Sequence, residues 1–176
     1  MVLQQQKALE EIAVNFLQRS QGDWNSQRRY YTLNQDIPPQ ELVSKIKVNF
    51  LPAGSPQLKK LALMHGLSEE LKGGSQVFWQ SNKAAEVDRA ISKGSTVLGV
   101  LGNILFRDRG FSTPKPVFAY YSCNDEATLS LKTEYDGSVF EEEFKLIGDL
   151  YRTRQTIISR ENEKLMIGQY LETRIS

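Results

Sequence analysis

The chain has 176 residues, a length typical of one domain that can enclose a ligand cavity. Its 22 basic and 21 acidic residues nearly cancel, so the composition does not favour nucleic-acid binding. One cysteine and one histidine exclude an internal disulfide, a cysteine-based zinc site and chemistry that needs paired histidines. We expect one metal-free domain, residues 1–176, in a reducing, cytoplasmic compartment, without a secretory leader or a membrane helix of roughly 18 apolar residues.

Two helices are expected in the first half of the chain. In residues 3–20, apolar side chains recur at the spacing of one helical face, and polar side chains occupy the other. This amphipathic pattern predicts a helix that packs against another element. A shorter helix follows Pro56 and ends near Gly66, with residues 69–71 as a candidate continuation.

Most of the remaining chain shows strand patterns. The first half holds three segments of this kind: 24–30, 42–50 and 77–79. The expected strands of the second half are 96–106, 117–123, 129–135, 138–146, 150–159 and 165–173. Asp136-Gly137 is a strong hairpin signal, and turn signals recur roughly every 8 to 12 residues. This spacing predicts a mainly β domain, either a sandwich or an up-and-down barrel of roughly 8 to 10 strands with room for one small ligand.

A set of alternating polar residues in the segment 151–158 is a candidate ligand site. Arg152, Arg154 and Thr156 leave the same face of the predicted strand. If this face points into a barrel, two guanidinium groups enter the cavity and suit an anionic ligand, especially one with carboxylates. The alternative is a solvated face whose arginines pair with the glutamates of residues 141–143.

The two tryptophans mark further candidate positions. Trp24, Ser26, Arg28 and Tyr30 would share one face of a first strand, which suits an aromatic acid. The alternative is a tryptophan that closes the barrel and is covered by an arginine. Trp79 is open to the same two interpretations, as a ligand platform or as part of the core.

Three other features favour structural roles. Residues 106–110 indicate a turn with local ion pairs, and a protein-docking surface is the alternative. Cys123 has no histidine or basic cluster beside it, so we expect an inert strand thiol. His65, just before Gly66, is expected to end a helix rather than act as a catalytic base.

Ordered landmarks along almost the whole chain resemble the S-type phycobilin lyases of cyanobacteria and algal plastids, the CpcS/CpeS-like chromophore lyases. No single landmark is diagnostic, but their ordered combination is specific. The matching segments are residues 16–20, 22–28, 65–66, 94–98, 107–110, 133–135, 141–142 and 152–154.

The resemblance implies a lipocalin-like antiparallel barrel close to fatty-acid-binding proteins, with an N-terminal helix and a short helix after the second strand. It also implies an activity, in which an open-chain tetrapyrrole such as phycocyanobilin is attached through a thioether to a cysteine of an apo-phycobiliprotein subunit. That acceptor would be phycocyanin, allophycocyanin or phycoerythrin. The bilin would be a substrate, and no permanently bound cofactor, nucleic acid or membrane is implied.

The resemblance further implies roles for individual residues. Arg152 and Arg154 would anchor the two propionates of the bilin, with Arg28 nearby. Glu142 would hydrogen-bond the pyrrole N–H groups and favour a protonated, more electrophilic ring system, so Glu142 and Arg152 are the expected catalytic residues.

The remaining expected contacts concern the rings and the polar end of the bilin. Trp79 and Tyr135 would pack against the rings, and Thr156 would support the polar end. The nucleophile would belong to the acceptor protein, so this chain would act by holding the bilin in a reactive orientation.

Two departures from the family pattern keep alternatives open. Many members carry two adjacent histidines where this chain has Tyr31-Thr32, and Ala85 replaces a second tryptophan. Some relatives work only as one half of a two-subunit lyase. The main alternative is therefore a noncatalytic bilin carrier or a U-type partner subunit. The chain could form a homodimer or pair with a paralogous lyase subunit. A fatty-acid carrier on the same fold is a third interpretation.

Overall fold

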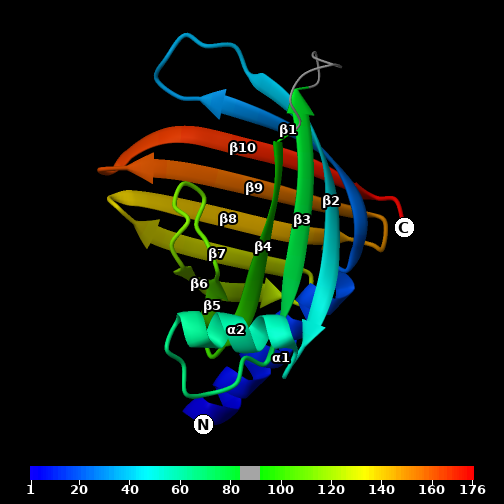
Figure 1. Cartoon of the computed structure of the whole chain (residues 1–176). Coiled ribbons are helices and arrows are strands. Elements are labelled where there is room, and N and C mark those ends of the chain that lie inside the picture. The colour runs from blue at the N-terminus through cyan, green and yellow to red at the C-terminus, as the bar shows by residue number, and fades with distance from the viewer. Residues whose placement is uncertain (84–91) are drawn as a thin grey trace.

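A closed antiparallel barrel dominates the computed structural model, which describes residues 1–83 and 92–176 (Figure 1). The described residues form two helices and ten strands. Consecutive strands are neighbours, and the first strand also pairs with the last, so the sheet closes on itself. The predicted up-and-down barrel is therefore confirmed, and the sandwich is excluded.

Most element bounds follow the predicted segments closely, but β3 extends well beyond the predicted 77–79 at both ends. The helices are α1 (Val2–Arg19) and α2 (Pro56–Met64), and neither is long and apolar enough to cross a membrane. The strands are β1 (Gly22–Thr32), β2 (Gln40–Pro52), β3 (Gly73–Lys83), β4 (Ser92–Leu101), β5 (Ile104–Arg107), β6 (Val117–Asp125), β7 (Thr128–Tyr135), β8 (Ser138–Ile147), β9 (Tyr151–Arg160) and β10 (Glu163–Arg174).

Two predicted boundaries were wrong, both because of a glycine in the left-handed region. The single strand expected over 96–106 is a hairpin of β4 and β5, which turns at Gly102 with φ 62°. Residues 69–71 do not continue α2, because Gly66 with φ 63° ends the helical path after His65.

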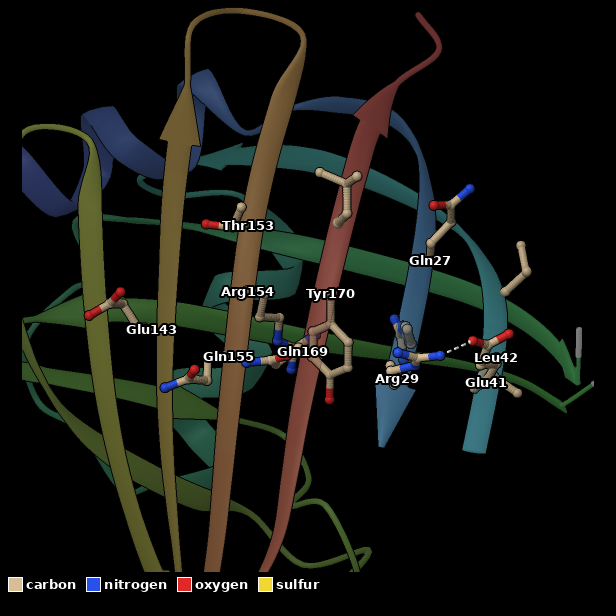
Figure 2. A pocket seen from close by; sticks show the side chains of 13 residues that line it. Gln27, Arg29, Glu41, Leu42, Glu143, Thr153, Arg154, Gln155, Gln169 and Tyr170 are labelled. Atoms are coloured by element: carbon tan, nitrogen blue, oxygen red, sulfur yellow. Dashed lines mark hydrogen bonds and ion pairs between the residues drawn. The ribbon is translucent and has the colours of Figure 1, made fainter. Parts of the chain in front are cut away.

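Side chains alternate between the interior of the barrel and its outer surface. On β9 and β10, Arg152 and Tyr170 are buried, whereas their chain neighbours Tyr151 and Leu171 are exposed. The outer wall is largely polar; Figure 2 shows one of its cross-strand ion pairs, in which Arg29 donates to Glu41 at 2.7 Å. Functional side chains inside the barrel therefore come from every second position.

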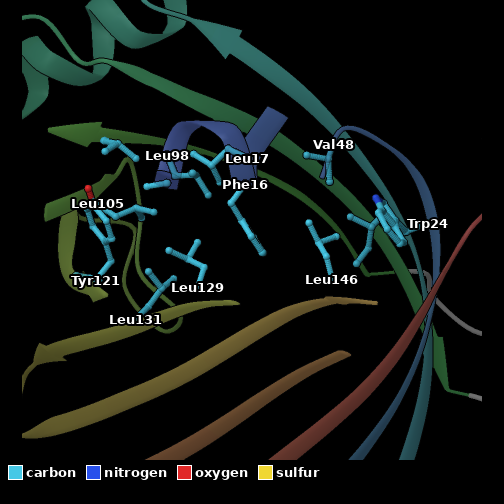
Figure 3. Packing of buried hydrophobic residues seen from close by; sticks show 14 residues of the cluster. Phe16, Leu17, Trp24, Val48, Leu98, Leu105, Tyr121, Leu129, Leu131 and Leu146 are labelled. Carbon is cyan, nitrogen blue, oxygen red and sulfur yellow. The ribbon is translucent and has the colours of Figure 1, made fainter. Parts of the chain in front are cut away.

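Helix α1 closes one end of the barrel. Ala13, Phe16 and Leu17 recur at helical spacing and are buried against strand residues such as Leu98 and Leu129 (Figure 3). The apolar cluster thus fills the end of the barrel near α1. The opposite end carries the turn between β7 and β8 and the loop after β5.

Trp24 seals the wall beside α1. Its side chain is fully buried, and its indole N–H donates to the carbonyl oxygen of Ser20 at 3.0 Å. The guanidinium of Arg174 lies 4.3 Å from the ring centroid, and that of Arg152 lies 4.9 Å away. Of the two interpretations of Trp24, this arrangement matches the tryptophan that closes the barrel and is covered by arginine. The covering arginines come from β9 and β10.

Helix α2 packs on the outer surface of β3 and β4. Leu58 and Leu61 are buried there, and Gly74 pairs with Gly99 in the sheet beneath them. A Cβ at Gly74 would overlap the backbone oxygen of Leu98, whereas a Cβ at Gly99 would meet only flexible leucine side chains, the nearest 2.8 Å away. The missing side chains let the helix approach the sheet closely.

We expect Gly74→Ala to lower the free energy of unfolding by about 1–3 kcal/mol, because the neighbouring backbone cannot move aside. Gly99→Ala is the matched control, and its loss should be smaller because leucine ends can shift. Urea denaturation of the two variants measures the difference. Equal losses would contradict this account of how α2 packs.

Candidate functional site

Two concave regions share part of one barrel wall, and Arg28, Leu42 and Arg154 line both. A groove of about 700 Å³ follows the wall between β1, β2, β9 and β10, and much of its lining consists of polar, outward-facing side chains such as Gln27 and Gln155. A cavity of about 540 Å³ lies inside the barrel and combines apolar walls with several cations. Enclosed apolar space with a few polar groups is typical of small-molecule sites, so we take the interior cavity as the candidate site.

The apolar part of this cavity begins at the core near α1. Phe16 and Leu17 form its floor, and Leu98, Leu105 and Leu131 continue upward along the strands (Figure 3). Removing the apolar surface of a ligand from water against these walls favours binding by roughly 25 cal/mol per Å². The floor therefore suits an extended, largely apolar molecule.

The cavity is also lined by an excess of positive charge. Two buried carboxylates, Glu142 and Glu172, face this set and compensate part of its charge. An anionic ligand is favoured, because these carboxylates leave a net positive charge on the lining, with Arg28 partly buried and Arg109 exposed. The lining guanidiniums are those of Arg28, Arg107, Arg109, Arg152 and Arg154.

Glu142 on β8 bridges two of these arginines. Its Oε1 accepts from Arg107 Nη2 at 3.0 Å, and its Oε2 accepts from Arg154 Nη2 at 2.6 Å. Burial alone raises the pKa of Glu142, but the two guanidiniums outweigh burial and hold the pKa below its usual value. Glu142 is therefore ionised at neutral pH and keeps both oxygens occupied.

A second ion pair lies closer to the sealed end of the barrel. Arg152 Nε donates to Glu172 Oε1 at 2.7 Å, and both side chains are buried. Burial raises the pKa of Glu172, but Arg152 and Arg154 outweigh it and lower the pKa overall. Because Arg152 also stacks on Trp24, it joins the cavity to the closed end of the barrel.

Arg28 and Arg109 differ from the other three arginines. Among the described residues, no carboxylate oxygen lies within 4.0 Å of either guanidinium. Arg28 donates to Ser26 Oγ at 3.2 Å, and Arg109 lies 5.6 Å from the centroid of the Trp79 ring. Among the described residues, Arg28 and Arg109 are therefore the cavity arginines without a carboxylate partner, and Nε of Arg107 and Nε of Arg154 also lack an acceptor.

Trp79 forms part of the cavity wall on β3. It is half-buried, and it lies flat over Gly94, where a Cβ would overlap the indole ring. The absence of a side chain at Gly94 thus fixes how far Trp79 extends into the cavity.

The predicted site residues are only partly brought together. Four of the seven line the cavity, and two others, Glu142 and Thr156, are buried on the same wall and form a cross-strand pair. Thr156 Oγ1 has no hydrogen-bond partner among the described residues, so it can still bind a polar group. The four lining residues are Arg28, Trp79, Arg152 and Arg154.

Tyr135 is not among the residues that line the cavity, so its expected contact with ligand rings stays a prediction. Its ring stacks on Phe140 at 5.0 Å, and its hydroxyl accepts a hydrogen bond from the backbone N–H of Ser112 at 2.9 Å. Phe111 stacks on the same Phe140 at 4.6 Å. Tyr135 therefore secures the loop after β5 at the open end of the barrel, and Phe111 rather than Tyr135 lines the cavity.

The family model described as "CpeS-like protein" matches residues 13–175. This CpeS-like chain belongs to that family.

Its relatives carry lyase names. A protein of Nostoc sp. named "Putative phycocyanobilin lyase CpcS 2" is 55% identical over 94% of this chain and 92% of its own length. A protein of Picosynechococcus sp. named "Putative chromophore lyase CpcV" is 50% identical over 91% of this chain and 80% of its own length. The solved structure of the S-type phycobiliprotein lyase CPES from Guillardia theta superimposes with a TM-score of 0.76, covering 92% of this chain and 91% of that one at 21% identity, which confirms the fold.

Several site residues of the CpeS-like chain escaped the sequence analysis. Arg107 and Arg109 fall in a charged run that indicates a turn, yet Arg107 ends β5 with its side chain inside the barrel. Asp108 between them accepts from Thr96 Oγ1 at 2.8 Å and from the backbone N–H of Val97 at 3.1 Å, which fixes the loop to β4. Arg107 lies two residues after Leu105, so on a strand both side chains point to the same face. This spacing was the signal that could have placed Arg107 inside the barrel.

Two other singled-out residues have structural contacts. His65 ends α2, and its Nε2 lies 2.9 Å from the carbonyl oxygen of Arg107. Cys123 is half-buried, and burial together with Asp125 raises the pKa of its thiol, which disfavours the reactive thiolate. The position of the replaced tryptophan, Ala85, lies outside the described residues.

We expect Glu142→Gln to cost about 3–5 kcal/mol of stability at pH 7, because it leaves two buried guanidiniums without their carboxylate. The folded pKa of Glu142 is lowered, so its contribution is complete above the unfolded value of about 4.3 and is lost as the pH falls through the folded value. The deficit of the variant should therefore shrink in acid.

Urea denaturation at pH 7 and at pH 3 measures this effect. Glu143→Gln changes the neighbouring exposed carboxylate and serves as the control, with an expected change within about 0.5 kcal/mol. A deficit for Glu142→Gln that is small at pH 7, or that grows in acid, would contradict the buried bridge.

Proposed function

We propose that this chain is a phycobiliprotein chromophore lyase. It binds an open-chain tetrapyrrole of the phycocyanobilin type and attaches it through a thioether to a cysteine of a phycobiliprotein subunit. The observation that carries the proposal is the interior cavity, where, among the described residues, five guanidiniums and two buried carboxylates lie around apolar walls. Family membership and the lyase names of the relatives support the same activity.

The cavity suits the chemistry of a bilin. A bilin has a long conjugated and largely apolar body, which would lie against the leucine-lined floor and Trp79. Its two propionates would pair with arginines, and Arg28 and Arg154 reach the cavity from β1 and β9. The cavity volume of about 540 Å³ falls within the usual range for small-molecule sites.

The reacting thiol would come from the acceptor. The one cysteine of this chain, Cys123, is half-buried and has a raised pKa. Addition of the acceptor's thiol across the ethylidene double bond forms the C–S bond and leaves the proton on the bilin, so no other reactant is consumed. The contribution of this chain is to hold the bilin with its ethylidene group in one orientation.

The proposed role of Glu142 changes in view of its contacts. An ionised carboxylate can accept hydrogen bonds from pyrrole N–H groups, but it cannot supply a proton. The Glu142 side chain is fully buried behind Arg107 and Arg154, so contact with the bilin would require one guanidinium to move, for example toward a propionate. If a bilin propionate replaced Glu142 as the partner of Arg154, Oε2 of Glu142 would become free to accept from the pyrrole N–H groups.

The proposal includes the partner and the location. The acceptor is an apo-subunit of phycocyanin, allophycocyanin or phycoerythrin, met in the cytoplasm, and a paralogous lyase subunit can form the second half of the enzyme. The test mixes the purified chain with phycocyanobilin and an apo-subunit, alone and with a paralogous subunit. An acid-stable covalent adduct on the acceptor, formed faster than the spontaneous product, is expected; no gain in rate in either mixture would refute the activity.

Arg28 gives the sharpest variant for this function. Among the described residues it has no carboxylate partner, so replacing it leaves no buried carboxylate unpaired. Arg28→Gln should weaken phycocyanobilin binding about tenfold or more, since a charged hydrogen bond of about 1.5–3 kcal/mol is lost. An absorbance titration measures the dissociation constant.

The matched control is Arg29→Gln, which removes the adjacent arginine on the outer face of the barrel. It should leave the dissociation constant within twofold or so of the wild-type value, because exposed ion pairs contribute little. Equal effects of the two variants would show that charge inside the cavity is not what holds the bilin.

A further inference from the structure

The ring of Tyr170 lies between two of the cavity arginines. Tyr170 on β10 faces Arg28 on β1 and Arg154 on β9, its cross-strand partners on either side. Each guanidinium carbon is 5.0 Å from the centroid of the ring. In Figure 2, Arg154 and Tyr170 lie side by side on their neighbouring strands. The tyrosine is thus the shared contact of both cations.

This arrangement fixes the separation of two like charges. Strands are about 4.8 Å apart, so β1 and β9, which flank β10, are separated by about 10 Å. The two guanidiniums repel each other, but each is attracted to the electron-rich face of the ring between them. Without the ring, the two cations would lose their shared contact, and Arg28 would be held by Ser26 and Arg154 by Glu142 and Phe144.

Neighbouring residues hold the ring in place. Tyr30 contacts it edge to face, with 5.7 Å between the centroids, and the Tyr170 side chain is buried. A Cβ at Gly168 would lie 2.7 Å from the Tyr170 hydroxyl oxygen, so the glycine makes room for the tyrosine. Burial raises the pKa of Tyr170 to about 12 against the opposing effect of Arg154, so the phenol stays neutral.

The two cations at the ring differ in their other contacts. Arg154 is paired with Glu142, whereas Arg28 donates to the neutral hydroxyl of Ser26. A ligand with one carboxylate would need only Arg28. A ligand with two carboxylates on flexible chains can engage both guanidiniums, the second in exchange for Glu142.

We propose that Tyr170 is a positioning residue that spaces Arg28 and Arg154 for the two carboxylates of one ligand. This inference rests on the proposed function, in which the ligand is a bilin with two propionates. It specifies the substrate class further, because the site selects the free dicarboxylic acid over its esters. Tyr170 acts through the arginines and needs no contact with the reacting carbon.

The experiment compares phycocyanobilin with its dimethyl ester, which keeps the apolar body and removes both charges. Absorbance titration gives a dissociation constant for each form, and their ratio is the diacid preference. The wild-type protein should prefer the diacid. Tyr170→Leu should lower this preference about three- to tenfold, because the cation–π contacts are lost, whereas Tyr170→Phe keeps the ring and should retain it.

Two sets of controls separate positioning from general damage. Tyr120→Leu makes the same change at an exposed outer tyrosine and should leave the ratio unchanged. Gly168→Ala should lower the diacid preference by displacing Tyr170, and adding Tyr170→Phe to it should partly restore the preference, since the hydroxyl nearest the new methyl is removed. Thermal melts of every variant report folding.

The possible results test the positioning role of Tyr170 separately from the lyase activity. If Tyr170→Leu weakens binding of the diacid and of the ester equally, or leaves their ratio unchanged, Tyr170 does not position the arginines. If the diacid preference behaves as expected but no adduct forms on any acceptor, the inference stands and the lyase activity fails. A wild-type chain that binds neither form of the bilin overturns both.

Discussion

The buried contact of Glu142 with Arg107 and Arg154 is the interaction on which the interior of this barrel depends. Cations inside a protein are costly unless they are paired, and here one carboxylate from β8 compensates guanidiniums from β5 and β9. Because Glu142 is shared, the cavity keeps a net positive charge while its arginines stay in defined positions. A fully compensated set would be neutral and would have little attraction for an anionic ligand.

The two ends of the barrel differ in structure and in the side chains that line them. Helix α1 and the stacked Trp24, Arg152 and Arg174 seal one end, where the apolar cluster supplies the packing. Toward the other end the side chains become cationic and aromatic, and Tyr135 secures the loop after β5 there. Arg152 belongs to both regions, so its replacement would disturb folding as well as binding.

Alternation and turn chemistry are local signals, so they predicted the strands and hairpins well but left a sandwich and a barrel open, and the family resemblance implied the barrel. Asp136-Gly137 and the period-two strands needed no knowledge of distant contacts. The site was only partly predictable. Parity placed Arg152 and Arg154 on one face, but Glu172 and Tyr170 joined them through pairing of β10 with β9 and β1, which no local pattern encodes. The charged residues around Arg107 indicated a turn, because charged residues also occur where a strand ends and a loop begins. The inward side chain of Arg107 at the end of β5 was therefore missed.

In the proposed function, the excess guanidiniums of the cavity bind the carboxylates of a bilin. A crystal structure of this chain with phycocyanobilin would show whether they do. We expect the tetrapyrrole inside the barrel, with its propionates on Arg28 and Arg154 and its rings against Trp79. Propionates directed into solvent, or a bilin bound on the outer wall, would contradict it.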